Sequence, residues 1–341
     1  MIASFDTIMN PPYTITPEIL HLVESITLKL GEINARYMSK PAPQLRKENR
    51  IRTIHASLSI EGNSLRLDQI TALLDGKKVI GPQSDILEVR NAIAAYEQLE
   101  SFNPFSSKSF LTAHGILMRD LVSDSGKWRR GSVGIVHGEK VAHIAPPASN
   151  VHGLMKELFA YVSKAPDSML IKSCVFHYEM EFIHPFNDGN GRMGRLWQTL
   201  LLSKHHPVFA SLPFETIIRD TQQDYYRALA TSDKLGQSTP FIFYMLRVID
   251  ESLNGITSSS TPMLKESDRV AYFLSHHRGA RAESKATEPT AGFTRKDYLQ
   301  VFKTLSTATA SRDLNAAVKS GVLKKTGNVN QTRYLYFSMQ Q

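Results

Sequence analysis

The chain has 341 residues, of which 42% are hydrophobic and 21% charged, a composition typical of a soluble globular protein with two or three domains. Its single cysteine, Cys174, excludes an intramolecular disulfide and a cysteine-rich zinc site, and it favours a reducing compartment. With neither a basic leader nor an apolar run of about 18 residues, the sequence predicts a cytoplasmic protein that does not contact a membrane.

Positive charge is concentrated towards the C-terminal end. The formal net charge is +8, and residues 261–341 carry 13 basic and 6 acidic side chains, a local charge of +7 that leaves about +1 for the first 260 residues. This asymmetry is typical of a module that meets a polyanion attached to a body with another task. A solvated basic surface would give the same balance.

Residues 15–255 have a mainly helical pattern, and an early helix is expected to end at Gly62. Ser57 and Glu61 are four residues apart and therefore share one face of that helix, while Gly62 is a natural C-cap. A glutamate in the last turn faces the negative end of the helix dipole. We therefore expect a partner that compensates Glu61, although a solvated glutamate would fit the same pattern.

Residues 132–145 interrupt the helical pattern. Val133 and Ile135 alternate, Gly138 offers a turn, and the extended stretch that follows ends at Pro146. This arrangement predicts a β-hairpin within an otherwise helical body.

Two helices are expected on either side of a glycine-rich loop. Ile171, Val175 and Tyr178 are spaced as the apolar stripe of an amphipathic helix, and another apolar pattern starts at Leu196. The loop between them forms the first part of the twelve-residue stretch His184-Pro-Phe-Asn-Asp-Gly-Asn-Gly-Arg-Met-Gly-Arg195.

The loop combines groups suited to phosphate chemistry. The Gly189-Asn-Gly191 turn can direct several backbone N–H groups at an anion, at the start of a helix near Arg192. Arg192 and Arg195 share a helix face and can reach one phosphate chain. Asp188 can hold Mg²⁺ beside phosphates, and His184 can take a proton near neutral pH.

Each part alone has an ordinary structural explanation. A histidine is often a core residue, a glycine pair is often a turn, and an arginine pair is often surface charge. Because all of them fall within twelve residues, we interpret the loop as a nucleotidyl or phosphoryl transfer site.

The loop resembles the motif of the Fic family, His-Pro-Phe-x-Asp/Glu-Gly-Asn-Gly/Lys-Arg-x-x-Arg, at every specified position. The resemblance implies a mainly α fold, with an N-terminal helical region at 1–90 and a helical catalytic core at 91–255. It also implies transfer of AMP from ATP to Ser, Thr or Tyr hydroxyls of target proteins and of the chain itself. The roles it implies are general base for His184, Mg²⁺ ligand for Asp188, α-phosphate contact for Asn190, amide donors for Gly189 and Gly191, β- and γ-phosphate binding for Arg192 and Arg195, and a core anchor for Phe186.

Two further regions take their interpretation from the same resemblance. The hairpin, with Val133, Gly134 and Ile135, is similar to the family's flap, which aligns a target segment by strand addition. Tyr225 and Tyr226 are candidates to border the adenine, and packing in the core is the alternative for both.

The upstream helix end resembles the family's inhibitory motif, Ser/Thr-x-x-x-Glu-Gly/Asn. In this sequence the motif runs from Ser57 through Glu61 to Gly62. The resemblance implies that Glu61 pairs with Arg195 and prevents the productive pose of the γ-phosphate, so that the chain inhibits itself. It leaves open whether Glu61 also activates water to remove AMP from a modified target.

The basic tail is expected to form a winged helix-turn-helix at 262–341. A linker at Ile256–Thr261 and a polar stretch at 278–292 precede it. A Thr294–Asp297 capping box starts one helix, and another runs from Thr309 to a stop at Gly321. Strand signals at 322–323 and 333–337 flank a turn at 326–328.

The tail has three possible partners. Arg312, Lys319, Lys324 and Lys325 could meet DNA phosphates. The same fold could instead contact a protein or form a homodimer. The alternative function is therefore a DNA-binding transcriptional regulator whose Fic-like body senses a nucleotide.

A third possible function keeps the fold but transfers another nucleotide, phosphate or phosphocholine. Gly191 together with both arginines favours ATP as the substrate.

Overall fold

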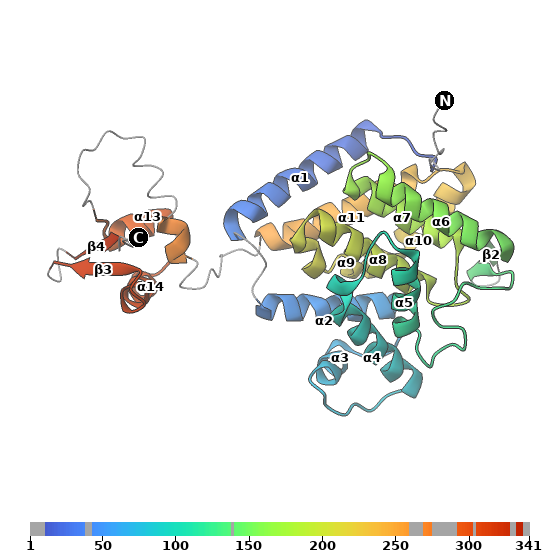
Figure 1. The fold of residues 1–341 in the computed structure, drawn as a ribbon, viewed down its shortest axis with the longest axis horizontal. Coiled ribbons are helices and arrows are strands. Elements are labelled where there is room, and N and C mark those ends of the chain that lie inside the picture. The colour runs from blue at the N-terminus through green and yellow to red at the C-terminus, as the bar shows by residue number, and fades with distance from the viewer. Residues whose placement is uncertain are drawn as a thin grey trace, which may run out of the picture. The chain divides into compact units, whose positions relative to one another are not determined.

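The structure is a computed structural model that describes residues 11–37, 43–137, 140–258, 269–274, 292–302, 305–327 and 332–336. It divides the chain into two compact units, Met1–Ser259 and Ser260–Gln341 (Figure 1). None of the described helices is long and apolar enough to span a membrane.

The first unit is built from helices and one hairpin. In chain order its helices are α1 (Pro17–Tyr37), α2 (Pro43–Ile60), α3 (Leu67–Leu74), α4 (Gln83–Glu97), α5 (Ser107–Leu117), α6 (Ala148–Lys164), α7 (Met169–Ile183), α8 (Asn190–His205), α9 (Glu215–Asp220), α10 (Gln222–Leu235) and α11 (Thr239–Ser258), with 3₁₀ turns at Leu99–Ser101 and Pro207–Ser211. The strands β1 (Gly134–His137) and β2 (Lys140–Ile144) lie between α5 and α6.

Helices α7 and α8 form the centre of this unit. All residues from Leu170 to Glu181 are buried, and so are all residues from Arg192 to Leu202. The sequence predicts a one-sided amphipathic helix here, but α7 is covered on every side, including its polar residues. A helix of this kind has to be surrounded by others; for example, Phe110 of α5 packs edge-on against Trp197 of α8, with ring centroids 4.9 Å apart.

Helix α2 is held against the core by buried polar contacts. The Asn49 side-chain amide donates to Ser211 O at 2.8 Å, and the Thr53 hydroxyl donates to Glu215 Oε2 at 3.2 Å. The helix ends at Ile60, and Gly62 follows with a φ of +93° that favours glycine. At the end of α2, Ser57 accepts two hydrogen bonds from Arg195 of the buried helix α8.

The hairpin is antiparallel. Gly134 pairs with Ile144 and His137 pairs with Lys140, with an irregularity between Ile135 and Val136. Gly138, the predicted turn residue, lies outside the described residues. Ala145 N donates to Val133 O at 3.4 Å, so the pairing continues weakly at the base of the hairpin.

The second unit contains helical residues 269–274, α13 (Arg295–Val301), α14 (Thr307–Lys319), β3 (Leu323–Thr326) and β4 (Arg333–Tyr336). The predicted capping box is confirmed, because Thr294 Oγ1 accepts from Asp297 N while Asp297 Oδ2 accepts from Thr294 N. Strands β3 and β4 are antiparallel, and Phe293 forms an additional bridge to Tyr334. Phe273, Tyr298 and Leu314 are fully buried in its core.

Several boundary predictions differ from the structure. Helix α14 begins at Thr307, two residues before the predicted Thr309, and β3 covers Leu323–Thr326 in place of the predicted 322–323. Helix α11 continues through Ser258, so the first three residues of the predicted linker at 256–261 are helical. Residues 259–261 and 278–291 lie outside the described residues. Thr326 belongs to β3, where it pairs with Arg333, so the predicted turn starts one residue later.

Candidate active site

His184 ends α7 in a backbone conformation that few non-glycine residues adopt. Its φ of 49° and ψ of 62° lie in the left-handed region, where a β-carbon is strained. The His184 amide donates to Met180 O at 2.9 Å, and the ring Nδ1 lies 3.4 Å from Glu181 O. The tautomer that donates from Nδ1 makes Nε2 the proton acceptor. The half-buried imidazole is therefore directed by the end of α7.

The loop after His184 is fixed from inside. Phe186 is fully buried and stacks on the His114 ring, with centroids 3.6 Å apart. Asn190 Oδ1 accepts from Phe186 N at 3.0 Å, and Asn190 Nδ2 donates to Phe186 O at 2.9 Å. Asn190 is only 2% exposed. The structure thus gives Asn190 a role in holding the loop, while its orientation of the α-phosphate stays a prediction.

The turn into α8 requires both glycines, for different reasons. Gly189 has a φ of +85° and precedes the first residue of α8. At Gly191 an added β-carbon would collide with the Glu61 carboxylate, which lies directly over this position. The start of α8 therefore offers backbone N–H groups, and the carboxylate of Glu61 already lies beside them.

Arg195 is the most buried charged group of the site. It is 0% exposed, and its Nη2 donates to Glu61 Oε1 at 2.7 Å and to Ser57 O at 2.9 Å. Its Nε donates to Ser57 Oγ at 3.0 Å. Burial is the largest influence on Arg195 and lowers its pKa, but the charge and hydrogen bond of Glu61 together with the nearby Tyr225 and Glu181 raise the pKa above its ordinary value. Ser57 and Glu61 therefore hold this guanidinium together.

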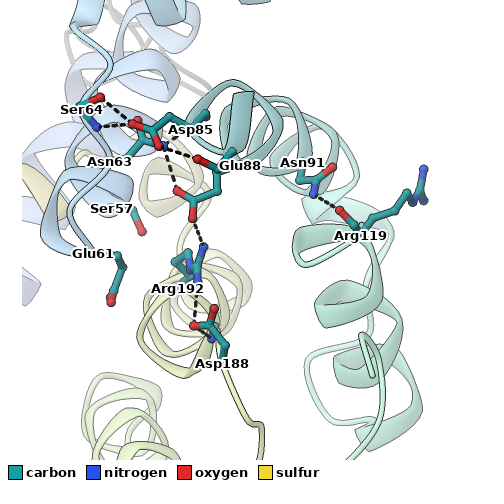
Figure 2. A network of polar contacts seen from close by, with 12 residues as sticks. Ser57, Glu61, Asn63, Ser64, Asp85, Glu88, Asn91, Arg119, Asp188 and Arg192 are labelled. Carbon is teal, nitrogen blue, oxygen red and sulfur yellow. Dashed lines mark hydrogen bonds and ion pairs between the residues drawn. The ribbon is translucent and has the colours of Figure 1, made fainter. Parts of the chain in front are cut away.

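Arg192 bridges two carboxylates at the other side of the helix start (Figure 2). Its Nη1 donates to Glu88 Oε1 at 3.0 Å, and its Nη2 donates to Asp188 Oδ1 at 2.9 Å. The Arg192 side chain is 6% exposed, compared with 22% for Glu88 and 57% for Asp188. Both predicted arginines are thus in place on α8, each engaged by an acidic side chain.

Comparison with known proteins identifies the fold and the motif. A sequence profile of the Fic/DOC family matches residues 104–202. The crystal structure of a Fic family protein from Desulfovibrio desulfuricans G20 is 41% identical in sequence and superposes with a TM-score of 0.71, over 98% of this chain and 100% of the other. This chain belongs to the Fic family.

Two more distant relatives of this Fic chain are named for an enzymatic activity. Protein adenylyltransferase Fic from Nematostella vectensis is 26% identical over 268 residues, which cover 72% of this chain and 58% of the relative. Protein adenylyltransferase Fic from Drosophila melanogaster is 25% identical over 248 residues, covering 68% and 47%. The chain therefore spans about half the length of the curated relatives it matches.

Asp188 fits the kind of metal ligand that the Fic motif implies. Its Oδ1 accepts from Gly189 N and Arg192, and its side chain is more than half exposed. Among the described residues, no group of three or more His, Cys, Asp or Glu side chains could hold a metal ion by itself. Mg²⁺ commonly takes one or two carboxylates and completes its shell with water and phosphate oxygens. A single exposed aspartate beside a phosphate site suits that mode of binding.

The two candidate adenine residues of this Fic protein differ in exposure. Tyr225 is 2% exposed, and its hydroxyl lies 3.2 Å from His177 Nε2 inside the core, which favours the core-packing alternative. Tyr226 is half-buried and its hydroxyl accepts from Gln222 Nε2 at 3.1 Å. The same Gln222 amide donates to Ile60 O, at the end of α2. Only Tyr226 therefore stays a candidate for nucleotide contact.

The hairpin residues are accessible where their side chains are described. Val133 is half-buried and Gly134 is exposed. Ile135 belongs to β1, and Ile144 at the end of β2 is 78% exposed. The structure thus confirms an antiparallel strand pair here, with its base at Val133 and Ala145.

Arg129 is a residue that the sequence did not single out. It is 2% exposed, and its guanidinium donates to backbone oxygens of His184 at 2.7 Å, Gly131 at 2.8 Å, Pro146 at 2.5 Å and Ile183 at 3.2 Å. The backbone N–H of Arg129 donates to Pro185 O at 2.9 Å. This side chain ties both ends of the hairpin to the end of α7. Nothing in the sequence around Arg129, which is followed by Arg130, indicates that role.

His114 is a second residue found only in the structure. Its Nδ1 accepts from Gly126 N at 2.8 Å, so its Nε2, 3.0 Å from Asp188 O, must carry the proton of the neutral ring. Burial lowers the pKa of His114 to about 4, which keeps the ring neutral at physiological pH. His114 thus supports the loop by a hydrogen bond to Asp188 O and by stacking on Phe186, while its other ring nitrogen is held by Gly126 N.

Proposed function

We propose that this Fic chain transfers AMP from ATP to a hydroxyl group of target proteins and of itself. The observation that carries the proposal is the strained His184 at the end of α7, followed within one loop by the amide groups and two arginines at the start of α8. The named activity of the relatives supports the same reaction.

The reaction requires one proton transfer and one displacement at phosphorus. His184 accepts the proton from a Ser, Thr or Tyr hydroxyl as the hydroxyl oxygen forms a bond to the α-phosphorus. The bond between the α-phosphorus and the bridging oxygen breaks, and pyrophosphate leaves with that electron pair. Arg192, Arg195 and the amides at the start of α8 stabilise the charge on the phosphates. Asp188 holds Mg²⁺, which neutralises phosphate charge when bound.

Glu61 inhibits this reaction within the same chain. Its carboxylate lies against Gly191 and pairs with Arg195, so it occupies a position that an anionic phosphate would need. ATP bound in the presence of Glu61 cannot use Arg195 for its γ-phosphate, and its α-phosphate is not in line for attack. The hairpin aligns the target segment through main-chain hydrogen bonds along β1.

Label transfer tests the reaction, the base and the inhibitor together. ATP labelled on the α- or the γ-phosphate is supplied with Mg²⁺ to wild type, Glu61→Gly and Glu61→Gly/His184→Ala. We expect label only from the α-phosphate, increased by Glu61→Gly and abolished when His184 is replaced. Label from the γ-phosphate would indicate a kinase-like reaction. Nucleotide binding without any label transfer would favour the sensor alternative.

A second function, DNA binding, is supported by the surface of the second unit. The only acidic residue of α14, Asp313, is 2% exposed and pairs with Arg269. The exposed charges of α14, β3 and β4 are therefore all basic among the described residues: Arg312, Lys319, Lys324, Lys325 and Arg333. We propose that this winged-helix surface contacts a phosphate backbone.

Salt dependence distinguishes this surface from a protein contact. The full chain is titrated with a DNA duplex at several salt concentrations, and Lys324→Ala/Lys325→Ala is compared with wild type. If both lysines contact phosphates, the slope of log affinity against log salt falls by about 2. Lys77→Ala/Lys78→Ala, an exposed lysine pair in the first unit, serves as the control. Absence of binding at low salt would leave the protein-contact and homodimer readings.

A further inference from the structure

The turn that follows α2 reaches both arginines of the Fic loop by separate routes. Glu61 contacts Arg195 directly, whereas Asn63, two residues later, contacts Glu88 of α4, which in turn contacts Arg192. Figure 2 shows Glu88 between Asn63 and Arg192, with Asp188 on the other side of the guanidinium. The proposed inhibition by Glu61 accounts for the first route only.

The second route is well anchored at its start. Asn63 Nδ2 donates to Glu88 Oε2 at 2.9 Å and to Asp85 O at 3.1 Å, while Asn63 N donates to Leu58 O at 3.1 Å. The next residue, Ser64, donates to Asp85 Oδ2 from its amide at 2.8 Å and its hydroxyl at 2.6 Å. The turn is therefore attached to the first two turns of α4. This attachment directs one oxygen of Glu88 to Asn63 and the other to Arg192.

We propose that Glu88 positions Arg192 for the phosphates of ATP, and that Asn63 orients Glu88 for this task. The inference rests on the proposed AMP transfer and assigns to it a residue outside the Fic motif. Glu88 acts through Arg192, so it is a positioning residue.

The contrast with Glu61 shows why Glu88 supports binding where Glu61 blocks it. The Glu61 carboxylate lies against Gly191, at the amides that an anion would use. The Glu88 carboxylate instead accepts from the side chains of Asn63 and Arg192, one on each oxygen. The guanidinium of Arg192 has five N–H donors, and its hydrogen bonds to Glu88 and Asp188 use two of them. A phosphate can therefore bind Arg192 while Glu88 stays in place.

Glu88 also affects the availability of Asp188. Arg192 is nearly buried, so its charge needs carboxylate partners. With Glu88 present, Asp188 is the second of two acidic partners and can turn towards a metal ion. If Glu88 is removed, Asp188 becomes the only acidic partner among the described residues and is held more firmly by the guanidinium. The loss of Glu88 should thus raise the Mg²⁺ concentration required for tight ATP binding.

The experiment uses the full chain with Glu61→Gly as the parent, so that inhibition by Glu61 does not enter. Glu88→Ala, Glu88→Gln, Asn63→Ala and Asn63→Ala/Glu88→Ala are added to it, and Glu97→Ala, an exposed glutamate on the same helix, is the matched control. ATP affinity is measured by calorimetry across a Mg²⁺ titration. KM for ATP, kcat for α-label transfer and the melting temperature are measured on the same samples.

The expected result is a loss of affinity with little loss of turnover. Glu88→Ala should weaken ATP binding and raise KM about tenfold, with kcat changed less than about threefold, and shift the Mg²⁺ dependence upward. Glu88→Gln keeps an oxygen that can accept from Arg192 but loses the negative charge, so it should recover part of the affinity while the Mg²⁺ dependence stays shifted upward. Asn63→Ala should cost about two- to threefold, and it should cost nothing further once Glu88 is absent. Glu97→Ala should match the parent.

Other outcomes overturn the inference. Unchanged or tighter ATP binding by Glu88→Ala would mean that Glu88 is a bystander or competes with phosphate. Additive effects of Asn63→Ala and Glu88→Ala would mean that Asn63 does not act through Glu88. A parent that binds ATP but transfers no α-label would contradict the proposed reaction alone, since calorimetry still reports the role of Glu88. A parent that does not bind ATP would contradict both.

Discussion

The Glu61 carboxylate receives a hydrogen bond from Arg195 at 2.7 Å, although the two residues are 134 positions apart in the chain. Arg195 is fully buried while the Glu61 side chain is 32% exposed, so the acidic partner is the one that can leave. The contact lies over Gly191, where an added β-carbon would force the carboxylate to shift away from its position beside Arg195. The proposed inhibition and the proposed phosphate binding therefore share the same few atoms of α8.

The first prediction concerns this close approach. Gly191→Ala alone should destabilise the fold by roughly 1–3 kcal/mol, because its β-carbon collides with the Glu61 carboxylate. In a Glu61→Gly background the same substitution should be neutral or stabilising by up to about 1 kcal/mol, as is usual for Gly→Ala within a helix. Chemical unfolding of the four variants measures the coupling. Equal effects of Gly191→Ala in both backgrounds would mean that Glu61 does not lie at this position in solution.

The second prediction concerns Arg129, which connects the hairpin to His184. In the Glu61→Gly background, Arg129→Lys should lower kcat by about tenfold or more, because a lysine cannot satisfy four carbonyl oxygens and the backbone of His184 loses its support. The ATP affinity should stay within about twofold, since Arg129 does not contact the start of α8. Arg130→Lys, an exposed neighbour, is the control. A loss of ATP affinity equal to the loss of kcat would indicate general damage to the site.

Much of this site could be predicted from the sequence because its residues are contiguous. The loop from His184 to Arg195 has fixed spacing, so the turn, the helix start and the shared face of the two arginines follow from local geometry. The pairing of Glu61 with Arg195, which the family resemblance implies, is present in the structure. The hairpin was also visible, since Val133 and Ile135 alternate within a helical region.

The remaining parts depend on contacts between distant segments. Arg129, His114 and Glu88 act on the loop from other elements, and none of them stands out by spacing or composition. The buried polar residues of α7 could not be predicted either, because periodicity records which residues are apolar and does not show how many helices surround them. Tyr225 illustrates the same limit, since its burial is determined by its contact with His177.

The third prediction follows from that buried histidine. His177 is 0% exposed, its Nδ1 lies 2.6 Å from Gln198 Oε1, and burial lowers its pKa to about 3. Because the pKa is lower in the folded state, the stability contribution is complete above about pH 6.5 and is lost as the pH falls towards 3. The unfolding equilibrium constant should rise roughly tenfold or more between pH 7 and pH 5 from this group alone.

A non-titrating variant isolates the effect. His177→Gln should be less stable than wild type at pH 7, and the difference between the two should shrink at pH 5. His114, whose pKa is also lowered, gives the same sign in both proteins and cancels in the comparison. A difference in stability that does not vary with pH would mean that His177 is not held neutral by the fold.

The fourth prediction concerns Glu215, which attaches α2, the helix that precedes Glu61, to the core. It is fully buried, and it accepts from Thr53 of α2 and Thr199 of α8, each at 3.2 Å. Burial raises its pKa to about 7 from an ordinary value of 4.5. The folded state therefore binds the proton more tightly than the unfolded state. Its contribution to stability is complete below about pH 4.5 and is lost as the pH rises through 7, the opposite sign to that of His177.

Glu215→Gln removes this titration while keeping an oxygen for one threonine. Relative to the variant, wild type should lose on the order of 3 kcal/mol of stability between pH 4 and pH 8. Thr53 lies on α2, so the weaker attachment of α2 at high pH should also release Glu61 more readily. The basal transfer of α-label by wild type should therefore rise with pH more steeply than the transfer by Glu215→Gln. Stability is read by chemical unfolding at each pH, and transfer by the labelled-ATP assay with Glu61→Gly as a reference that lacks inhibition. If wild type and Glu215→Gln keep a constant difference in stability across this range, the buried carboxyl does not titrate near neutrality, and any pH dependence of the inhibition arises elsewhere.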